Sequence, residues 1–325
     1  MKIQFAALKA CAVAGGLMLS AFHALAAEVR YYPVPAGSSP HDVAAAPDGT
    51  VWYTAQRSGH LGILDPKTGR NELVALGKGK GSSPHGVIVG PDGAAWITDS
   101  GQNAIVRVDP KTRAVKLFPL PKDTPYANLN TAAFDAKGVL WYTGQSGYYG
   151  SVDPKSGEVK VWKAPKGRGP YGIAATPSGD IYYASLAGNH IAKIDTATGL
   201  AGVIEPPTPN QGARRVWSDS KGNIWVAEWL SGNLSRYNPQ DRSWKMFKPP
   251  VENPRTYSVY VDDKDRVWIT EWTHNAIMRF DPDTQKWTSF PSSETNAQVR
   301  QMLGRPGEAW GAESARDRLV VVSEK

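Results

Sequence analysis

Residues 39–54 read SPHDVAAAPDGTVWYT, and the pattern within this stretch decides the fold. It recurs at residues 83–98 as SPHGVIVGPDGAAWIT and, more loosely, at residues 169–184 as GPYGIAATPSGDIYYA. Each copy has two short, largely apolar runs on either side of a Pro-Asp-Gly or Pro-Ser-Gly sequence. Because such residues form tight turns, two short runs that flank them are typical of a β-hairpin. The repeated unit is therefore predicted to begin with a hairpin.

An aromatic residue marks the same place in the second run of every unit. Successive anchors lie 44, 45, 41, 43, 43 and 42 residues apart, by subtraction of their positions. Repeats of this length are characteristic of propeller blades. The anchors are Trp52, Trp96, Trp141, Tyr182, Trp225, Trp268 and Trp310. The chain is therefore predicted to contain seven repeats.

Each unit has room for two further short strands. The first unit continues with an apolar run at residues 61–64 and a turn at residues 65–69 (DPKTG). A similar run and turn return at residues 105–112 and 277–284, and fourth runs such as residues 115–118 alternate between apolar and polar. The mature chain shows no sustained helical periodicity. The sequence therefore predicts an all-β fold, a seven-bladed β-propeller with four-stranded blades.

The two ends of the chain complete one blade in this scheme. The seventh unit has a third strand at residues 319–322 and no fourth strand before the sequence ends at Lys325. The segment YPVP at residues 32–35 matches the end of a fourth strand, FPLP at residues 118–121. We therefore expect the N-terminal strand to pair with the last blade and close the ring, which removes an exposed sheet edge. A six-bladed propeller with an unpaired tail is the alternative.

Residues 1–26 have the pattern of a cleavable export signal. Lys2 and Lys9 are followed by an apolar run at residues 10–21, too short to span a bilayer, and then by the small-residue site ALA at residues 24–26. We predict cleavage after Ala26, a single propeller domain over residues 27–325, and a periplasmic or secreted location. The only cysteine, Cys11, would leave with the signal, so a disulfide or thiol nucleophile is not expected.

The charge of the mature chain limits its partners. Loss of Lys2 and Lys9 lowers the formal net charge from +7 to +5. Lys and Arg form no run dense enough to suggest a nucleic-acid stripe, and no second apolar segment reaches transmembrane length. We therefore expect a small-molecule ligand or substrate, no nucleic acid, no membrane insertion and a monomer.

The first hairpin of each unit brings two strand ends together at one mouth of the ring. Residues equidistant from the turn of an antiparallel hairpin lie side by side, so counting from the turn at residues 48–49 puts His41 opposite Gln56. The same count predicts these neighbours: His85 with Ser100 and Asp99, Arg214 with Trp229 and Glu228, Tyr257 with Trp272 and Glu271, and Arg300 with Glu313. Because the innermost strands line the axis, we expect all these side chains at one mouth of the central channel.

The mouth position varies although the anchor position does not. Along the seven units it reads His41, His85, Asn130, Tyr171, Arg214, Tyr257 and Val299. A repeat that keeps its packing residues and diversifies at one level indicates an asymmetric site at that level. The alternative is that these polar residues only solvate a wet channel mouth.

The complete unit resembles that of the streptogramin lyase family, also called the virginiamycin B lyases. The shared features are Pro-His-x-Val, Pro-Asp-Gly, x-Trp-x-Thr, an asparagine before the third strand (Asn103, Asn189 and Asn275) and a final Phe-Pro-x-Pro. They cover nearly the whole mature chain. The resemblance implies a seven-bladed propeller that opens a cyclic streptogramin B ester by magnesium-dependent elimination.

The motif match places the family's catalytic histidine pair at His41 and His85, on neighbouring blades. The resemblance implies that Asp99 and Glu313 are the nearby acids that hold Mg²⁺. The metal would polarise the ester carbonyl, and a neutral imidazole would remove the acidified α-proton. The remaining mouth residues would bind the substrate, namely Gln56, Tyr171, Arg214, Glu228, Trp229, Tyr257, Glu271, Trp272 and Arg300. The family's pair lies in the last two blades, where this chain has Tyr257 and Val299.

Two other functions fit the same sequence. A gluconolactonase-like hydrolase would bind a divalent metal through Glu, Asn and Asp, but within a six-bladed ring. A non-catalytic propeller would bind a small molecule, glycan or peptide. Its support is the aromatic and basic half of the mouth, formed by Tyr171, Arg214, Trp229, Tyr257 and Trp272, which could stack on and clamp an anionic ligand.

Overall fold

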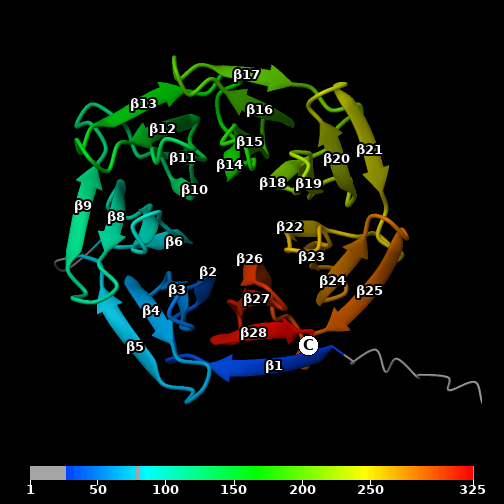
Figure 1. The fold of residues 1–325 in the computed structure, drawn as a ribbon, viewed down its shortest axis with the longest axis horizontal. Helices are drawn as coiled ribbons and strands as arrows, with labels where there is room; N and C mark the ends of the chain where they lie inside the picture. The colour runs from blue at the N-terminus through cyan, green and yellow to red at the C-terminus, as the bar shows by residue number, and fades with distance from the viewer. Residues whose placement is uncertain (1–26, 78–80, 325) are drawn as a thin grey trace, which may run out of the picture.

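The computed structural model describes residues 27–77 and 81–324, and every regular element in that part of the chain is a β-strand. The signal expected at residues 1–26 therefore lies outside the described residues. Seven four-stranded antiparallel sheets form a closed ring around a central axis (Figure 1). In the described part, no helix is long and apolar enough to cross a membrane. The seven-bladed prediction is confirmed, and the six-bladed alternative is wrong.

Each blade runs outward from the axis in four steps. The innermost strands are β2 (Pro40–Ala45), β6 (Pro84–Val89), β10 (Leu129–Phe134), β14 (Pro170–Ala175), β18 (Ala213–Ser218), β22 (Thr256–Val261) and β26 (Val299–Arg305). The second strands are β3 (Val51–Ala55), β7 (Ala95–Asp99), β11 (Leu140–Gly144), β15 (Ile181–Ser185), β19 (Ile224–Glu228), β23 (Val267–Glu271) and β27 (Glu308–Glu313). The third strands are β4 (His60–Leu64), β8 (Ala104–Val108), β12 (Tyr148–Val152), β16 (His190–Ile194), β20 (Leu234–Asn238), β24 (Ala276–Asp281) and β28 (Arg318–Ser323). The outer strands are β5 (Asn71–Ala75), β9 (Val115–Pro119), β13 (Val159–Lys163), β17 (Ala201–Ile204), β21 (Ser243–Phe247), β25 (Lys286–Pro291) and β1 (Glu28–Pro33).

The aromatic anchors hold neighbouring blades together. Trp52 of the first blade packs in one cluster with Val87 and Ile97 of the second, and the other anchors are buried in the same way. A buried indole needs a partner for its N–H group, and the hairpin turn supplies one. Trp96 donates to Asp92 at 3.0 Å, for example. Packing and turn therefore both require an aromatic residue here, which explains why the position repeats.

The asparagine motif before the third strand has a conformational reason. Asn103 adopts a φ of 50° there, in the left-handed region that Asn and Gly tolerate. The same place in the other blades is also left-handed, at Gly59, Gly147, Asn189, Gly232, Asn275 and Asp317. The asparagine side chain also links two blades, since the Asn103 Oδ1 atom accepts from the Ala127 N–H at 2.9 Å.

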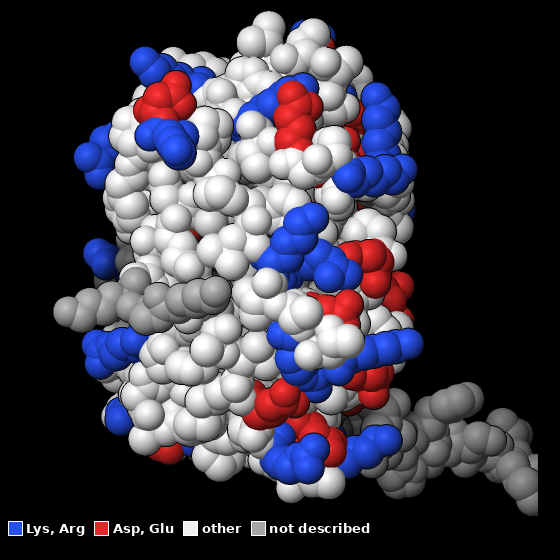
Figure 2. All heavy atoms as spheres, turned by 90° about the vertical axis from the view of Figure 1, so that its left-hand side faces the viewer, with Lys and Arg blue, Asp and Glu red and all other residues white. Residues whose placement is uncertain are grey.

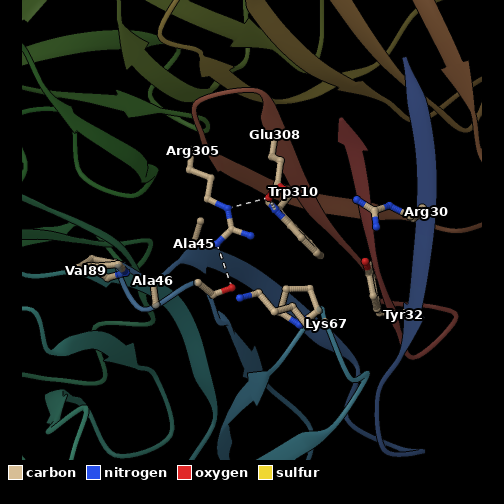
Figure 3. Close-up of a pocket in the computed structure, with 12 residues that line it drawn as sticks. Arg30, Tyr32, Ala45, Ala46, Lys67, Val89, Arg305, Glu308 and Trp310 are labelled. Atoms are coloured by element: carbon tan, nitrogen blue, oxygen red, sulfur yellow. Dashed lines mark hydrogen bonds and ion pairs between the residues drawn. The ribbon is translucent and has the colours of Figure 1, made fainter. Parts of the chain in front are cut away.

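The ring closes at the expected place. Strand β1 pairs with β28 throughout its length, from Glu28 opposite Ser323 to Pro33 opposite Arg318 (Figure 1, blue beside red). Behind this seam lies a hollow of about 930 Å³, and Figure 3 shows Arg30, Lys67 and Arg305 around it. The Arg305 guanidinium is already engaged by Glu308 at 2.8 Å. The hollow reaches the turn-side ends of innermost strands at Ala45 and Val89, and none of the paired bulge residues lines it.

The innermost hairpins differ from the expected register. In the first blade Pro40 pairs with Ala55 and Val43 with Tyr53, so two residues face one across a β-bulge. The same irregularity occurs in all seven innermost hairpins. The predicted pairing of His41 with Gln56 is therefore wrong. With Val43 opposite Tyr53, the regular part of the hairpin is already one residue out of the predicted register, and the bulge shifts the pairing by one more.

The bulge also corrects the alignment of the last blade. Val299 pairs with Glu313 as Pro40 pairs with Ala55. Arg300, and not Val299, is therefore the equivalent of His41. Each bulge contains two consecutive residues, and both lie next to the axis. These residues form the candidate site.

The outer face of the ring is mixed in charge. Figure 2 shows one side of the molecule, where Lys and Arg side chains lie between Asp and Glu side chains and broad uncharged areas separate them. Several of these charges pair across short distances, such as Arg107 with Asp92 at 2.7 Å. On this face the charges do not form a patch of one sign.

Candidate functional site

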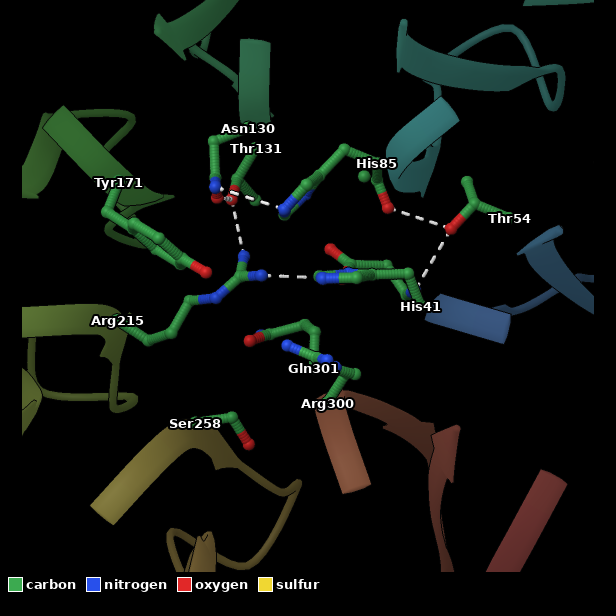
Figure 4. Close-up of polar contacts among 12 residues, drawn as sticks. His41, Thr54, His85, Asn130, Thr131, Tyr171, Arg215, Ser258, Arg300 and Gln301 are labelled. Carbon is green, nitrogen blue, oxygen red and sulfur yellow. Dashed lines mark hydrogen bonds and ion pairs between the residues drawn. The ribbon is translucent and has the colours of Figure 1, made fainter. Parts of the chain in front are cut away.

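The site is built from the bulges of the seven innermost strands, whose side chains converge on the axis (Figure 4). The first bulge positions are His41, His85, Asn130, Tyr171, Arg214, Tyr257 and Arg300. The second bulge positions are Asp42, Gly86, Thr131, Gly172, Arg215, Ser258 and Gln301. The residues of the first set were predicted from the sequence to lie at the channel mouth, and those of the second set were not. Together they form what we call the bulge site.

The two predicted histidines meet at the axis. The rings of His41 and His85 have centroids 3.8 Å apart and are 4% and 5% exposed. Nδ1 of His41 lies 2.7 Å from a carboxylate oxygen of Asp42, and a neutral ring donates its Nδ1–H there and keeps Nε2 as an acceptor. The amide of Asn130 donates to Nε2 of His85 at 3.2 Å. Both rings are thus held in defined orientations.

Burial and nearby cations keep the histidines neutral. Burial lowers the pKa of His41 well below its usual range, and Arg300, Arg215 and Arg214 lower it further. Burial also lowers the pKa of His85 well below its usual range, with the neighbouring His41 as the next cause. Both imidazoles are therefore unprotonated at pH 7, as a general base must be.

A buried ion pair lies beside the histidines. Nη2 of Arg215 is 3.3 Å from the Asp42 oxygen that also contacts His41, and the Arg215 side chain is 1% exposed. Nη1 of Arg215 donates to the hydroxyl of Thr131. Burial raises the pKa of Asp42, and the Arg215 charge opposes that shift. Asp42 thus connects an imidazole on the first blade to a guanidinium on the fifth.

Threonine hydroxyls lock the histidine side of the site. Thr54 accepts a hydrogen bond from the Asp42 N–H at 3.0 Å and donates to the His85 carbonyl at 2.7 Å. Thr98 makes the equivalent bridge, from the Gly86 N–H at 2.8 Å to the Asn130 carbonyl at 2.5 Å. Each bridge satisfies an N–H group freed by the bulge and ties it to the next blade. This is the physical role of the x-Trp-x-Thr motif.

Arginine and aromatic side chains form the other side of the site. The Arg214 guanidinium lies 3.9 Å from the ring centroid of Tyr257, 4.6 Å from that of Tyr171 and 4.7 Å from that of Trp229. It also donates to the Tyr171 hydroxyl at 2.8 Å, which is 3.1 Å from the Tyr257 hydroxyl. The predicted aromatic and basic half is therefore brought together.

Trp272 and Arg300 extend this half. The ring of Trp272 stacks on Tyr257 with centroids 4.6 Å apart and planes 4° from parallel. The Arg300 guanidinium lies 4.8 Å from the Trp272 centroid. Burial would raise the pKa of Tyr257, but the charges of Arg214, Arg300 and Arg215 outweigh it and lower the pKa to about 7. Burial and the neighbouring Tyr257 raise the pKa of Tyr171 to about 12.

The predicted acids of the mouth bind loops. Asp99, the last residue of β7, accepts from the Ser83 N–H at 2.8 Å and from Ser82 Oγ at 2.6 Å. Glu271 accepts from the Arg255 N–H at 2.8 Å and the His274 N–H at 2.7 Å. The remaining members of this set behave alike: Glu228 accepts from Gln211 at 2.7 Å, and Glu313 accepts from Ser292 at 2.8 Å and from Arg318. Gln56 lies beyond the end of β3.

One group in the described part of the chain could hold a metal ion. It consists of His41, Asp42 and His85, whose donor atoms lie within 4.8 Å of one another, and it includes neither Asp99 nor Glu313. Magnesium prefers several oxygen ligands in octahedral geometry. Two imidazoles and a carboxylate already paired with Arg215 do not fit this preference. Magnesium stays a prediction from the resemblance.

The fold is shared with solved propellers of several kinds. A streptogramin B lyase structure superimposes with a TM-score of 0.84 at 20% identity, covering 92% of this chain and 98% of that one. Virginiamycin B lyase from Staphylococcus aureus gives 0.84 at 18% identity, covering 92% and 100%. YCF48 bound to a D1 peptide gives 0.72 at 12% identity, covering 91% and 97%. Among curated protein sequences, none matches this chain.

These superpositions show the fold alone, whereas similarity in sequence identifies the family. The profile of the Virginiamycin B lyase family matches residues 21–248, well over half of the 325 residues. That range contains the bulges and anchors of the first five blades and the threonine bridges of the first three. The chain therefore belongs to the virginiamycin B lyase family.

Proposed function

We propose that this protein is a lyase-like enzyme that opens a cyclic ester or lactone at the bulge site, with His41 as the general base. The observation that carries the proposal is the buried series of contacts from His41 to Asp42 and from Asp42 to Arg215. A carboxylate that accepts from Nδ1 fixes the imidazole ring and its tautomer, and leaves Nε2 able to take a proton.

The reaction is an elimination that needs no water as a nucleophile. Nε2 of His41 takes a proton from the carbon next to a carbonyl group of the substrate. The electron pair of that C–H bond forms a carbon–carbon double bond, and the ester C–O bond breaks. The leaving group departs as a carboxylate, and the imidazolium then returns its proton to solvent.

The cations of the site serve both the base and the developing charge. Arg300, Arg215 and Arg214 lower the pKa of His41, which keeps it unprotonated. A ring with so low a pKa is also a weak base, so the substrate proton must be acidified. Negative charge that forms on the carbonyl oxygen would be stabilised by Arg214 or Arg300, because fixed cations in a buried site act strongly on such charge.

Mass spectrometry of a cyclic ester tests this reaction. Quinupristin, which is bound to a catalytically inactive histidine-to-alanine variant of the S. aureus lyase, is the first substrate to try, followed by macrolactones whose ring oxygen is attached to the carbon β to a second carbonyl group. Elimination opens the ring without changing the mass and creates a new double bond, whereas hydrolysis adds one water. We expect an opened product of unchanged mass.

Variants at the base connect this product to the site. His41→Ala should abolish ring opening, and Asp42→Asn should lower kcat by about 10²-fold or more because the imidazole loses its orientation. His60→Ala is the matched control, since His60 begins β4 and lies away from the axis. Full activity in the double variant His41→Ala, His85→Ala would end the proposal.

Binding without catalysis is the second candidate, favoured by the three rings around Arg214. Such a pocket suits a planar anion, which would stack on Tyr or Trp and pair with an arginine. Thermal shift with aromatic carboxylates, with and without a chelator, separates the two candidates. Stabilisation lost in Arg214→Met, retained in His41→Ala and accompanied by no turnover would favour binding.

The place of action is a further part of the proposal. Support comes from the sequence of residues 1–26 and from a likeness to the extracellular domain of a putative hybrid two-component system from B. thetaiotaomicron, with a TM-score of 0.72 at 17% identity over 90% of this chain and 42% of that one. Fractionation followed by N-terminal sequencing tests it. We expect periplasmic or secreted protein that begins at Ala27, and cytoplasmic protein with an intact N-terminus would contradict this.

A further inference from the structure

The central channel continues past the bulge site as a separate cavity. Its volume is about 230 Å³, and it is bounded by the innermost strands on the side of the hairpin turns. Apolar side chains from several blades form most of the wall, among them Val89, Phe134 and Leu303. Trp217 contributes from the fifth blade. Neither catalytic histidine lines this space.

Polar groups lie only at the end of the cavity next to the bulge site. They belong to Asp42, Thr131 and Gln301, all second bulge positions. Gln301 is 3% exposed, and its Oε1 atom is buried without a hydrogen-bond partner, although its Nε2 group donates to the Met302 carbonyl at 3.2 Å. A buried acceptor with no partner costs free energy, which a donor in the cavity would recover.

The polar end of the cavity determines which hydrogen-bonding groups and which charge a ligand should have. Gln301 Oε1 and the Asp42 carboxylate are acceptors, and the Thr131 hydroxyl already donates to Asn130 at 2.7 Å. A ligand therefore needs a donor at one end. A cation is disfavoured because Arg215 lies 3.3 Å from Asp42. The remaining class is a neutral molecule with one hydroxyl or N–H group on an apolar body.

The volume limits the size of that body. A dry apolar cavity of about 150 Å³ accommodates benzene, so this cavity has room for one six-membered ring with small substituents. We infer that the turn-side half of the channel is a binding site for a small, neutral, mostly apolar alcohol or phenol, whose hydroxyl donates to Gln301. This site shares Asp42, Thr131 and Gln301 with the bulge site, but the inference does not depend on the reaction proposed above.

Calorimetric titration with p-cresol tests the inference, and toluene is the comparison ligand because it lacks only the hydroxyl. We expect p-cresol to bind with a stoichiometry of one and toluene to bind more weakly. Gln301→Met removes the acceptor at nearly constant length, so it should weaken p-cresol several-fold and leave toluene unchanged. Leu303→Trp fills the cavity and should abolish binding of both, and Val89→Phe is a second filling variant if the first does not fold.

His85→Ala is the control, because it alters the bulge site and leaves the cavity walls intact. It should bind p-cresol like the unmodified protein even if it has lost all ring-opening activity. Unchanged p-cresol binding in folded Leu303→Trp and Val89→Phe would overturn the inference. So would the absence of p-cresol binding to the unmodified protein, whatever the outcome of the catalytic experiments.

Discussion

The two halves of the bulge site are held in place by different means. In the first three blades, Thr54, Thr98 and Thr143 bridge each bulge to the backbone of the next blade. In the fourth, fifth and seventh blades, Ala184, Ala227 and Ala312 stand at that position. Threonine bridges to the backbone thus fix the histidines, whereas the arginines and aromatic rings are held mainly by contacts between side chains, such as the hydrogen bond from Arg214 to the Tyr171 hydroxyl.

This difference suggests a division of labour within one ring. A general base needs a fixed position, because small displacements of a catalytic group lower the rate steeply. A binding surface gains from side chains that can adjust to the ligand. His41 is 4% exposed, so substrate entry requires movement, and we expect that movement in the half that lacks threonine bridges. Four experiments test whether the two halves are held in place by different means.

The largest expected change in the free energy of unfolding follows from breaking the buried ion pair between Asp42 and Arg215, which joins the two halves. Arg215→Met leaves the Asp42 carboxylate buried without its cation, and removing one partner of such a pair costs about 3–5 kcal/mol. Arg214→Met, one residue away, removes an arginine that has aromatic partners and no carboxylate. Denaturant unfolding of both variants is the measurement. An equal loss in free energy of unfolding would mean that Asp42 does not depend on Arg215.

Removing the hydroxyl of a threonine bridge should lower the free energy of unfolding by a smaller amount. Thr98→Val keeps the shape but leaves the Gly86 N–H and the Asn130 carbonyl without their partner, which costs about 1–3 kcal/mol. Thr270→Val is the matched control in the sixth blade, where the hydroxyl contacts only Ser258 of its own blade. Unfolding should separate the two variants. A control that is as damaging as Thr98→Val would show that bridging between blades is unimportant.

The third experiment titrates the arginine–aromatic half. Tyr257 has a pKa lowered to about 7, so near-ultraviolet absorbance should show one tyrosinate forming around neutral pH. The signal should vanish in Tyr257→Phe and persist in Tyr171→Phe. Since the folded pKa lies below the unfolded value, this group stabilises the fold above about pH 10, and that stability is lost as the pH falls toward 7. A tyrosinate that forms only near pH 10 would contradict the strong field of the arginines.

The smallest effect is expected on the histidine half. Because the pKa of His41 is well below its usual range, kcat/KM of Tyr257→Phe, which lacks the group that titrates near pH 7, should stay flat as the pH falls from 8 to about 6.5 and decline only further down. The linked stability has the matching sign: it is present above the unfolded pKa and is lost as the pH falls toward the folded one. NMR titration of the imidazole carbons gives the pKa directly, and a value near 6.5 would show that the site is wetter than its burial indicates.

The closed ring of seven blades could be predicted from the sequence, but the second layer of site residues, such as Asp42 and Arg215, could not. Hairpin turns, anchors and the segment at residues 32–35 follow from local rules, so blade number and ring closure could be predicted. The register of the innermost hairpins could not, because a bulge shifts the pairing by one residue. Asp42 and Arg215 were not predicted, because strict alternation along a strand would place them on the face opposite His41 and Arg214.

A signal for the bulge was present all the same. Gly86 and Gly172 occupy second bulge positions, where a Cβ atom would lie 2.7 Å from the Asn130 carbonyl oxygen and 2.6 Å from the Arg215 Cα. Glycine inside a strand often marks a bulge or a close approach of two backbones. The roles of Asp99 and Glu313 were harder to predict. A carboxylate that faces the channel mouth and one that accepts hydrogen bonds from a loop can occupy the same position at the end of a second strand.

Closure of the ring by β1 also governs when folding can finish. Ser323 donates to the Glu28 carbonyl across 295 positions of sequence, so the last contact to form joins nearly the first described residue to nearly the last. A chain still in synthesis can stack its early blades, but it cannot close until β28 has been made. Until then the open edges of the unfinished sheets are free to pair with another copy. We therefore expect ring closure to be a late, slow step whose competitor is association between chains.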